Sequence, residues 1–120
     1  PMKFNDMLTA DAHEAGAEME VMHPATGEAT GVFIRVRGID SKSYRAAATE
    51  YNRKAAKAKS DDEKEQAALD LDVAITAGWR GIDDMEFSAE AARKLYTDSP
   101  SIRAQVASFF VNRRNFITAS

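Results

Sequence analysis

The sequence predicts an α+β fold, mostly helical, with an N-terminal β-hairpin packed on about four helices. Within residues 18–38, apolar and polar side chains alternate as they do in half-buried strands, where neighbours face opposite sides. Residues 41–78 and 79–117 repeat apolar side chains at three- and four-residue steps, which is the spacing of one helical face. Residues that favour helix N-caps precede these helical patterns.

Composition limits the class of protein. A length of 120 residues predicts one domain, 1–120. Charged residues make up 29% of the chain and the net charge is -3, which disfavours a nucleic-acid partner because such proteins usually present a basic face. Cysteine is absent, which excludes disulfides and thiol chemistry and fits a reducing compartment. We find no apolar run of the ~20 residues that span a membrane, so we expect no membrane partner.

Residues 1–17 have two interpretations. They form either a short helix or a mostly irregular N-terminal arm. In the helical interpretation Asn5 is a cap and Gly16 ends the helix. Its apolar face would consist of Met7, Leu8, Ala12 and Ala15.

Residues 18–38 predict a β-hairpin whose turn contains Pro24 and Gly27. Two registers stay open. A long loop places Glu20 opposite Arg35 and matches their charges, whereas a tight turn places Glu20 opposite Gly31. An isolated hairpin is only marginally stable, so we expect these strands to pack on helices or to pair with another chain. The unpaired edge therefore suggests self-association.

Residues 41–78 predict a helical hairpin. Asp40 or Ser41 caps the first helix, and Ser60 caps a second helix that runs to about Gly78. The acidic residues after Ser60 suit a helix N-terminus, so two antiparallel helices are favoured over one long helix.

Residues 79–117 predict a Trp/Phe loop followed by two helices. Ser88 caps the shorter helix, and Ser99 followed by Pro100 begins the longer one, because proline at the first helical position gives up no needed N–H. We expect the longer helix to continue to Arg113 and on to Phe116.

Residues able to do chemistry are scattered. His13 and His23 have no neighbours at metal-ligand spacing, and we interpret both as surface or strand histidines. The acidic residues 61–63 are better explained as helix-capping residues than as a calcium loop, and no phosphate-binding glycine loop occurs. We therefore expect no catalytic residue, no metal, no cofactor and no enzymatic activity.

Aromatic side chains are the remaining candidates for a site. Trp79 and Phe87 flank a loop, and a core role is favoured over a partner interface for both. The adjacent residues Phe109 and Phe110 cannot both face one core, so a partner role is as well supported as a core role for Phe110 and Phe116. The candidate partner-binding residues are Phe110, Phe116, Arg113, Trp79 and Phe87.

Two groups of motifs resemble the small tail assembly chaperones of long-tailed, siphovirus-type bacteriophages and prophages, over roughly residues 19–117. The first group consists of His23-Pro24-Ala25-Thr26-Gly27-Glu28, Gly38-Ile39-Asp40-Ser41 and Tyr44. The second consists of Gly78-Trp79, Phe87-Ser88-x-Glu90, Leu95-Tyr96, Pro100-x-Ile102, Gln105-Val106 and Asn112-Arg113-x-x-Phe116. The sequence departs from the family pattern at Ala91 and at Ile82-Asp83-Asp84.

This resemblance implies a chaperone of virion morphogenesis. Such proteins bind the tape measure protein, keep it soluble and help to recruit major tail tube subunits. The resemblance further implies a location in the cytoplasm of the bacterial host and absence from the mature virion. Two alternatives stay open: a structural tail or head-completion protein retained in the virion, and a small regulatory nucleic-acid binder, which the acidic balance disfavours.

Overall fold

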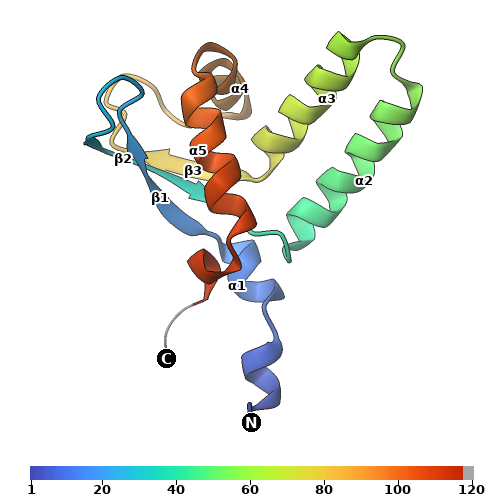
Figure 1. The fold of residues 1–120 in the computed structure, drawn as a ribbon, viewed down its shortest axis with the longest axis vertical. Coiled ribbons are helices and arrows are strands. Elements are labelled where there is room, and N and C mark those ends of the chain that lie inside the picture. Colours follow the sequence, from blue (N-terminus) through green and yellow to red (C-terminus); the bar gives the residue numbers. More distant parts are fainter. Residues whose placement is uncertain (118–120) are drawn as a thin grey trace.

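A computed structural model describes residues 1–117 and confirms the α+β class, with an antiparallel three-stranded sheet and five α-helices in that range (Figure 1). In chain order the elements are η1 (Phe4–Met7), α1 (Ala10–Ala15), β1 (Ala17–Met22), β2 (Ala29–Val36), α2 (Lys42–Lys57), α3 (Asp61–Ala74), β3 (Thr76–Arg80), α4 (Ala89–Asp98), α5 (Pro100–Val111) and η2 (Arg113–Phe116).

The hairpin formed by β1 and β2 has neither of the two predicted registers. Glu20 lies opposite Phe33, and Glu18 is the residue opposite Arg35. The turn between the strands consists of residues 23–28. The N–H of Gly27 donates to the carbonyl of His23 (2.8 Å), and Gly27 adopts a φ of 73°. A bulge between Glu20 and Met22 then shifts the pairing.

The strand β3 corrects the prediction of a helix up to Gly78. Helix α3 ends at Ala74, and residues 76–80 pair antiparallel with β2, which places Trp79 opposite Ile34. The side-chain hydroxyl of Thr76 lies 2.6 Å from the hydroxyl of Tyr96 in α4. Both contacts join residues distant in sequence, so tertiary pairing overrides the local helical pattern. The predicted two-stranded hairpin is thus part of a larger sheet, with order β1-β2-β3.

Helices α2 and α3 form the predicted antiparallel hairpin, and the predicted break at Ser60 is confirmed. The hydroxyl of Ser60 accepts from the N–H of Glu63 (3.1 Å), and the hydroxyl of Ser41 caps α2 by accepting from the N–H of Tyr44 (3.0 Å). The hairpin projects from the body of the molecule (Figure 1). In the described chain α2 has no buried residue, so it packs on its neighbours with half-buried side chains only.

The two C-terminal helices begin where predicted. Ser88 caps α4, and Pro100 is the first residue of α5. The expected extension of the last helix to Phe116 is wrong, because Asn112 is extended and ends α5 at Val111. The side chain of Asn112 accepts from the N–H of Arg114 (3.1 Å) and starts the separate 3-10 turn η2.

Residues 1–17 contain two short helical segments, η1 and α1, so they form neither a single helix nor a mostly irregular arm. Gly16 ends α1 as predicted, with a φ of 80° and its N–H bonded to the carbonyl of Ala12. Thr9 rather than Asn5 precedes α1, and Met7 and Leu8 are exposed, so the expected apolar face is wrong. Residues 1–8 extend away from the body below α1 (Figure 1).

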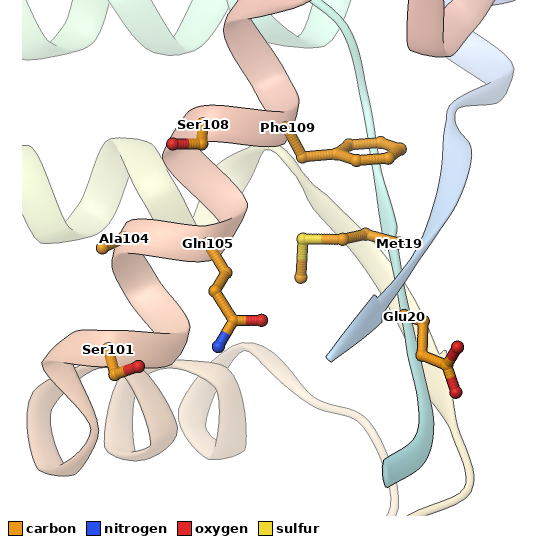
Figure 2. A pocket seen from close by; sticks show the side chains of 7 residues that line it. All are labelled: Met19, Glu20, Ser101, Ala104, Gln105, Ser108 and Phe109. Carbon is orange, nitrogen blue, oxygen red and sulfur yellow. The ribbon is translucent and has the colours of Figure 1, made fainter. Parts of the chain in front are cut away.

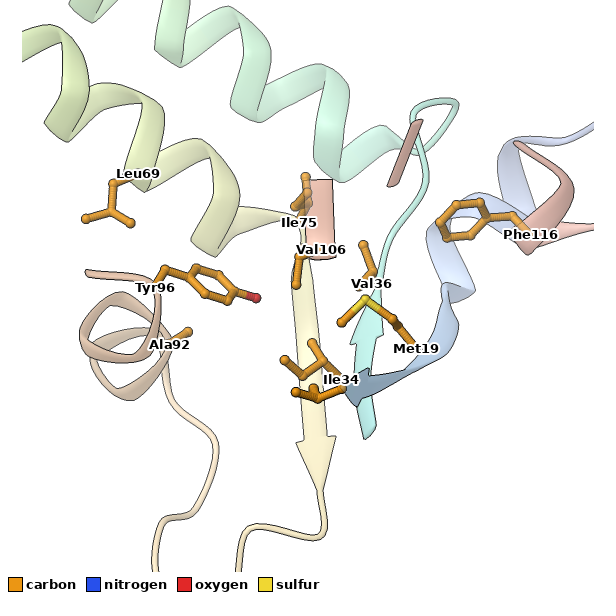
Figure 3. Close-up of a cluster of buried hydrophobic side chains, with 10 residues drawn as sticks. Met19, Ile34, Val36, Leu69, Ile75, Ala92, Tyr96, Val106 and Phe116 are labelled. Carbon is orange, nitrogen blue, oxygen red and sulfur yellow. The ribbon is translucent and has the colours of Figure 1, made fainter. Parts of the chain in front are cut away.

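The core lies on one face of the sheet. Ile34 and Val36 of β2 are fully buried against side chains of α3, α4 and α5, and Phe116 closes the end of this cluster near α1 (Figure 3). The opposite face carries charges, with Arg80 bonded to Glu18 (2.6 Å) and stacked over the Phe33 ring. Among residues 1–117 no helix is long and apolar enough to cross a membrane.

Candidate partner-binding surface

Trp79 and Phe87 hold the loop between β3 and α4. Their rings meet edge to face, with centroids 5.1 Å apart, and Trp79 Nε1 donates to the carbonyl of Met85 (3.0 Å). Both rings are half-buried against the core. The ring contact and the hydrogen bond therefore fix this loop against the core. A partner-binding role for either residue stays a prediction.

Phe110 and Phe116, both candidate partner-binding residues from the sequence, lie in different environments. Phe110 is half-buried and packs on the ring of Tyr44 in α2 (centroids 5.0 Å apart). Phe116 is 3% exposed and packs between the rings of His13 (4.8 Å) and Phe109 (5.6 Å). A partner reaches Phe116 only by unpacking the core, so the structure gives this residue a core position.

Arg113 is exposed, and its guanidinium binds the carboxylate of Asp40 (3.2 and 3.3 Å). The same carboxylate accepts a hydrogen bond from the hydroxyl of Thr9 (2.6 Å). Arg113 and Thr9 together hold the pKa of Asp40 below its usual value. This ion pair connects η2 to the start of α2, which is a structural reason for an arginine at this position.

His13 is the residue that sequence reasoning misplaced most clearly. It is fully buried in α1, where a surface or strand histidine was expected. The N–H of Asp40 donates to Nδ1 (2.9 Å) and the N–H of Gly38 donates to the His13 carbonyl (2.9 Å). A Cβ on Gly38 would lie 2.1 Å from Nδ1, so the glycine is required by the ring. The motif of residues 38–41 is thus built around His13.

The protonation of His13 follows from these contacts. Nδ1 accepts a hydrogen bond, so the neutral ring carries its proton on Nε2. Nε2 has no hydrogen-bond partner among the described residues and lies 3.6 Å from an Asp40 oxygen. Burial lowers the pKa of His13; the Asp40 carboxylate opposes this effect and Arg113 adds to it. The ring is therefore a neutral packing element of the junction.

Helix α5 is flanked by two open grooves. The first, here called the β1–α5 groove, has a volume of about 570 Å³ and is lined by Met19, Ser101, Ala104, Gln105, Ser108 and Phe109, with Glu20 beside them (Figure 2). The second, here called the α3–α5 groove, has a volume of about 510 Å³ and is lined by residues that include Leu69, Asp72, Pro100, Arg103, Ala104 and Ala107.

The surface of α5 between these grooves is almost uncharged. Arg103 is the one charged residue in the sequence of α5, and its guanidinium is held by Asp72 and Glu65 of α3. Ala104 and Ala107 are exposed and small, so a partner backbone can approach closely. The sequence offered no sign of the grooves, because each is formed by elements far apart in the chain.

The described residues contain no group of three or more His, Cys, Asp or Glu side chains able to hold a metal ion. Tyr96 is buried, burial raises its pKa to about 12, and its hydroxyl lies 2.6 Å from that of Thr76. Comparison of the chain with family models, curated proteins and solved structures found no match.

Proposed function

We propose that this protein is a tail assembly chaperone of a long-tailed phage or prophage, which binds the tape measure protein and helps to recruit major tail tube subunits. The motifs of residues 19–117 support this proposal through their order and spacing. The observation that carries it is the uncharged surface of α5 beside an open groove, which fits an elongated helical partner.

The α3–α5 groove is the part of this surface that we assign to the tape measure protein. Pro100 offers apolar contact, and the exposed alanines 104 and 107 leave room for the backbone of a partner helix. The carboxylates of Asp72 and Glu65 outnumber Arg103 at the rim, which favours a partner helix with basic residues beside its apolar face.

Co-expression with the tape measure protein encoded beside this chain tests the proposal. We expect the wild-type chain to keep that protein soluble and to co-purify with it. Ala107→Glu adds a carboxylate to the acidic rim and should reduce the co-purified amount at least tenfold. Ala46→Glu makes the same change on the exposed side of α2 and is the matched control. An insoluble tape measure protein with no complex would refute the proposal.

The proposed location is the cytoplasm of the bacterial host, with the protein absent from the finished particle. Mass spectrometry of purified virions checks this part. Detection at the copy number of a tail component would contradict the chaperone role and support a structural protein retained in the virion.

A further inference from the structure

His13 of α1 carries the one buried side-chain polar atom that has no hydrogen-bond partner in the described chain, Nε2. Such atoms are rare in folded proteins, because an unsatisfied buried donor costs roughly 1–3 kcal/mol. An Asp40 carboxylate oxygen lies 3.6 Å away, but it already accepts hydrogen bonds from Thr9 and Arg113. Burial of the neutral ring therefore leaves one donor unpaired.

The folded junction around this ring does not accommodate a second proton. Nδ1 accepts the N–H of Asp40 (2.9 Å), so a proton on Nδ1 would set two donors against each other. The ring has little space in which to turn, since a Cβ added to Gly38 would lie 2.1 Å from Nδ1. A charged ring would also bring a second cation to the carboxylate that Arg113 binds. Protonation therefore acts against both the backbone contact and the side-chain contact of Asp40.

The 3-10 turn η2 closes this junction. Phe116 packs on the His13 ring with centroids 4.8 Å apart, and Figure 3 shows its side chain at the α1 end of the core. Two further contacts hold η2: the ion pair of Arg113, and the side-chain amide of Asn115, which donates to the carbonyl of Phe109 (2.9 Å). The extended residue 112 separates η2 from α5, so η2 can detach without unwinding the helix.

The charged groups that face the ring belong to two elements. Asp40 lies in the segment before α2, and Arg113 lies in η2. Within α1, the neighbouring Glu14 is bound by Ser43 (2.6 Å) and Arg37 (3.3 Å). Burial lowers the pKa of the ring, the Asp40 carboxylate opposes this effect and Arg113 adds to it. A ring exposed by detachment of η2 has the ordinary pKa of 6.5, so acid favours the detached state.

We propose that acidification detaches η2 from His13 before the core of the domain unfolds. One additional proton binds in the detached state, so the equilibrium constant for detachment rises by up to tenfold for each pH unit below 6.5. Detachment uncovers the side of the Phe109 ring on which Phe116 packs, and it therefore exposes apolar surface at the end of α5. This behaviour depends on neither the proposed function nor a partner.

Amide hydrogen exchange, followed by NMR from pH 8 to 5 and corrected for the intrinsic effect of pH on exchange, tests the proposal. Asn115 and Ile117 report on η2, because their N–H groups donate to the carbonyls of Asn112 and Arg114, and Ile34 reports on the core. Below pH 6.5 the opening constant of η2 should rise by up to tenfold per pH unit and should exceed the core value throughout. An opening constant of η2 that is independent of pH, or equal to that of the core, would overturn the proposal.

The two histidines of the chain provide a matched pair of variants. His13→Asn keeps an oxygen acceptor close to the position of Nδ1 and cannot be protonated, so the pH dependence at η2 should disappear. His23→Asn is the control, because His23 is exposed in the hairpin turn and its Nδ1 also accepts a backbone N–H, that of Ala25 (3.1 Å). It should keep the wild-type pH dependence. Equal pH dependence in His13→Asn and the wild type would contradict the proposal.

A second pair of variants tests the anchor of η2 even if His13→Asn does not fold. Arg113→Gln removes the ion pair with Asp40 and should raise the opening constant of η2 at pH 8 about two- to fivefold. Arg114→Gln is the control, because the Arg114 side chain is exposed and forms no ion pair within residues 1–117. An unchanged opening constant in Arg113→Gln would show that Asp40 does not hold η2, which contradicts the proposed route of release.

Discussion

Replacing Phe116 by alanine distinguishes a core residue from a partner-binding residue. The side chain is 3% exposed and packs against the rings of His13 and Phe109. Truncation of a buried phenylalanine to alanine costs about 3–5 kcal/mol, from lost burial and from the cavity that remains. The two ring contacts place Phe116 within this range rather than below it.

The corresponding change in melting temperature follows from the size of the chain. A domain of 120 residues has an unfolding entropy of about 0.25 kcal/mol/K near its midpoint. A loss of 3–5 kcal/mol therefore lowers the melting temperature by roughly 12–20 °C. Differential scanning calorimetry measures this shift, and agreement of the calorimetric and van't Hoff enthalpies checks that unfolding is two-state.

Ile117→Ala is the matched control, because Ile117 is the next residue and is 60% exposed. Its melting temperature should stay within about 2 °C of wild type, since exposed positions rarely change stability by more than ~0.5 kcal/mol. If Phe116→Ala melts like the wild type but no longer associates with a partner, the packing argument fails and the partner-binding prediction made from the sequence is right.

Phe110→Ala gives an intermediate result for a physical reason. The ring is half-buried, and its contact with Tyr44 contributes about 0.5–1.5 kcal/mol beyond the buried area. We expect the melting temperature to fall clearly but less than in Phe116→Ala. A loss of association larger than the loss of stability would keep Phe110 as a partner-binding residue; a loss of stability alone would make it a core residue.

Three further changes test the junction and the sheet edge. Burial lowers the pKa of His13 below its ordinary value of 6.5, so on acidification the unfolded chain binds this proton at a higher pH than the folded chain. The stability that comes from the neutral ring is therefore complete above about pH 6.5 and is lost as the pH falls through the folded pKa. Thermal melts from pH 8 to 5 measure this loss, and an NMR titration of the ring above pH 6.5 would contradict it. Gly38→Ala brings a Cβ to 2.1 Å from the His13 ring and should cost about 1–3 kcal/mol in urea unfolding, whereas an unchanged midpoint would show that the ring moves freely. Gln105→Ala removes two side-chain hydrogen bonds to the backbone of Met22 (2.8 and 2.9 Å), so we expect the free energy of unfolding to fall by about 1–2 kcal/mol. The edge of β1 is then uncovered, so we also expect more aggregation, measured by light scattering. Unchanged scattering would show that Gln105 does not protect this edge.

The helices were predictable because their ends are set by neighbouring residues. Ser60 and Ser88 accept hydrogen bonds from N–H groups three residues later, and Pro100 begins α5 without losing a needed donor. Such signals act within one turn of chain, so the sequence alone is enough to read them. The same locality explains the error at the end of α5, where no glycine or proline announces that Asn112 leaves the helix.

The strand β3 and the register of the hairpin depend on distant partners. Residues 76–80 follow α3 with one residue between, and their strand character comes from pairing with residues of β2 that lie 40 to 47 positions earlier. The register depends on a six-residue turn and a bulge beside Met22. Neither leaves a pattern of its own in a segment this short.

His13 illustrates why the candidate surface was harder to predict than the fold. Its burial needs Gly38 to leave space, the N–H of Asp40 to bond the ring and Phe116 to cover it, and these residues come from two parts of the chain that are far from His13 in sequence. The grooves beside α5 arise in the same way, from β1 on one side and α3 on the other. The sequence around a single histidine, or around a small residue on a helix, does not indicate which distant residues it will contact.

The motifs behind the family resemblance occupy positions that build the fold. His23 bonds the turn through its Nδ1, Ser41 caps α2, Trp79 pins a loop and Gln105 covers the edge of β1. Residues with such roles are expected to persist wherever this architecture is kept, whatever partner is bound. The resemblance therefore bears mainly on the fold. The residues that recognise a partner must be sought at exposed positions between the motifs. Those positions include Ala107, which is why the variant that tests the proposed function changes an exposed side chain and leaves the motifs intact.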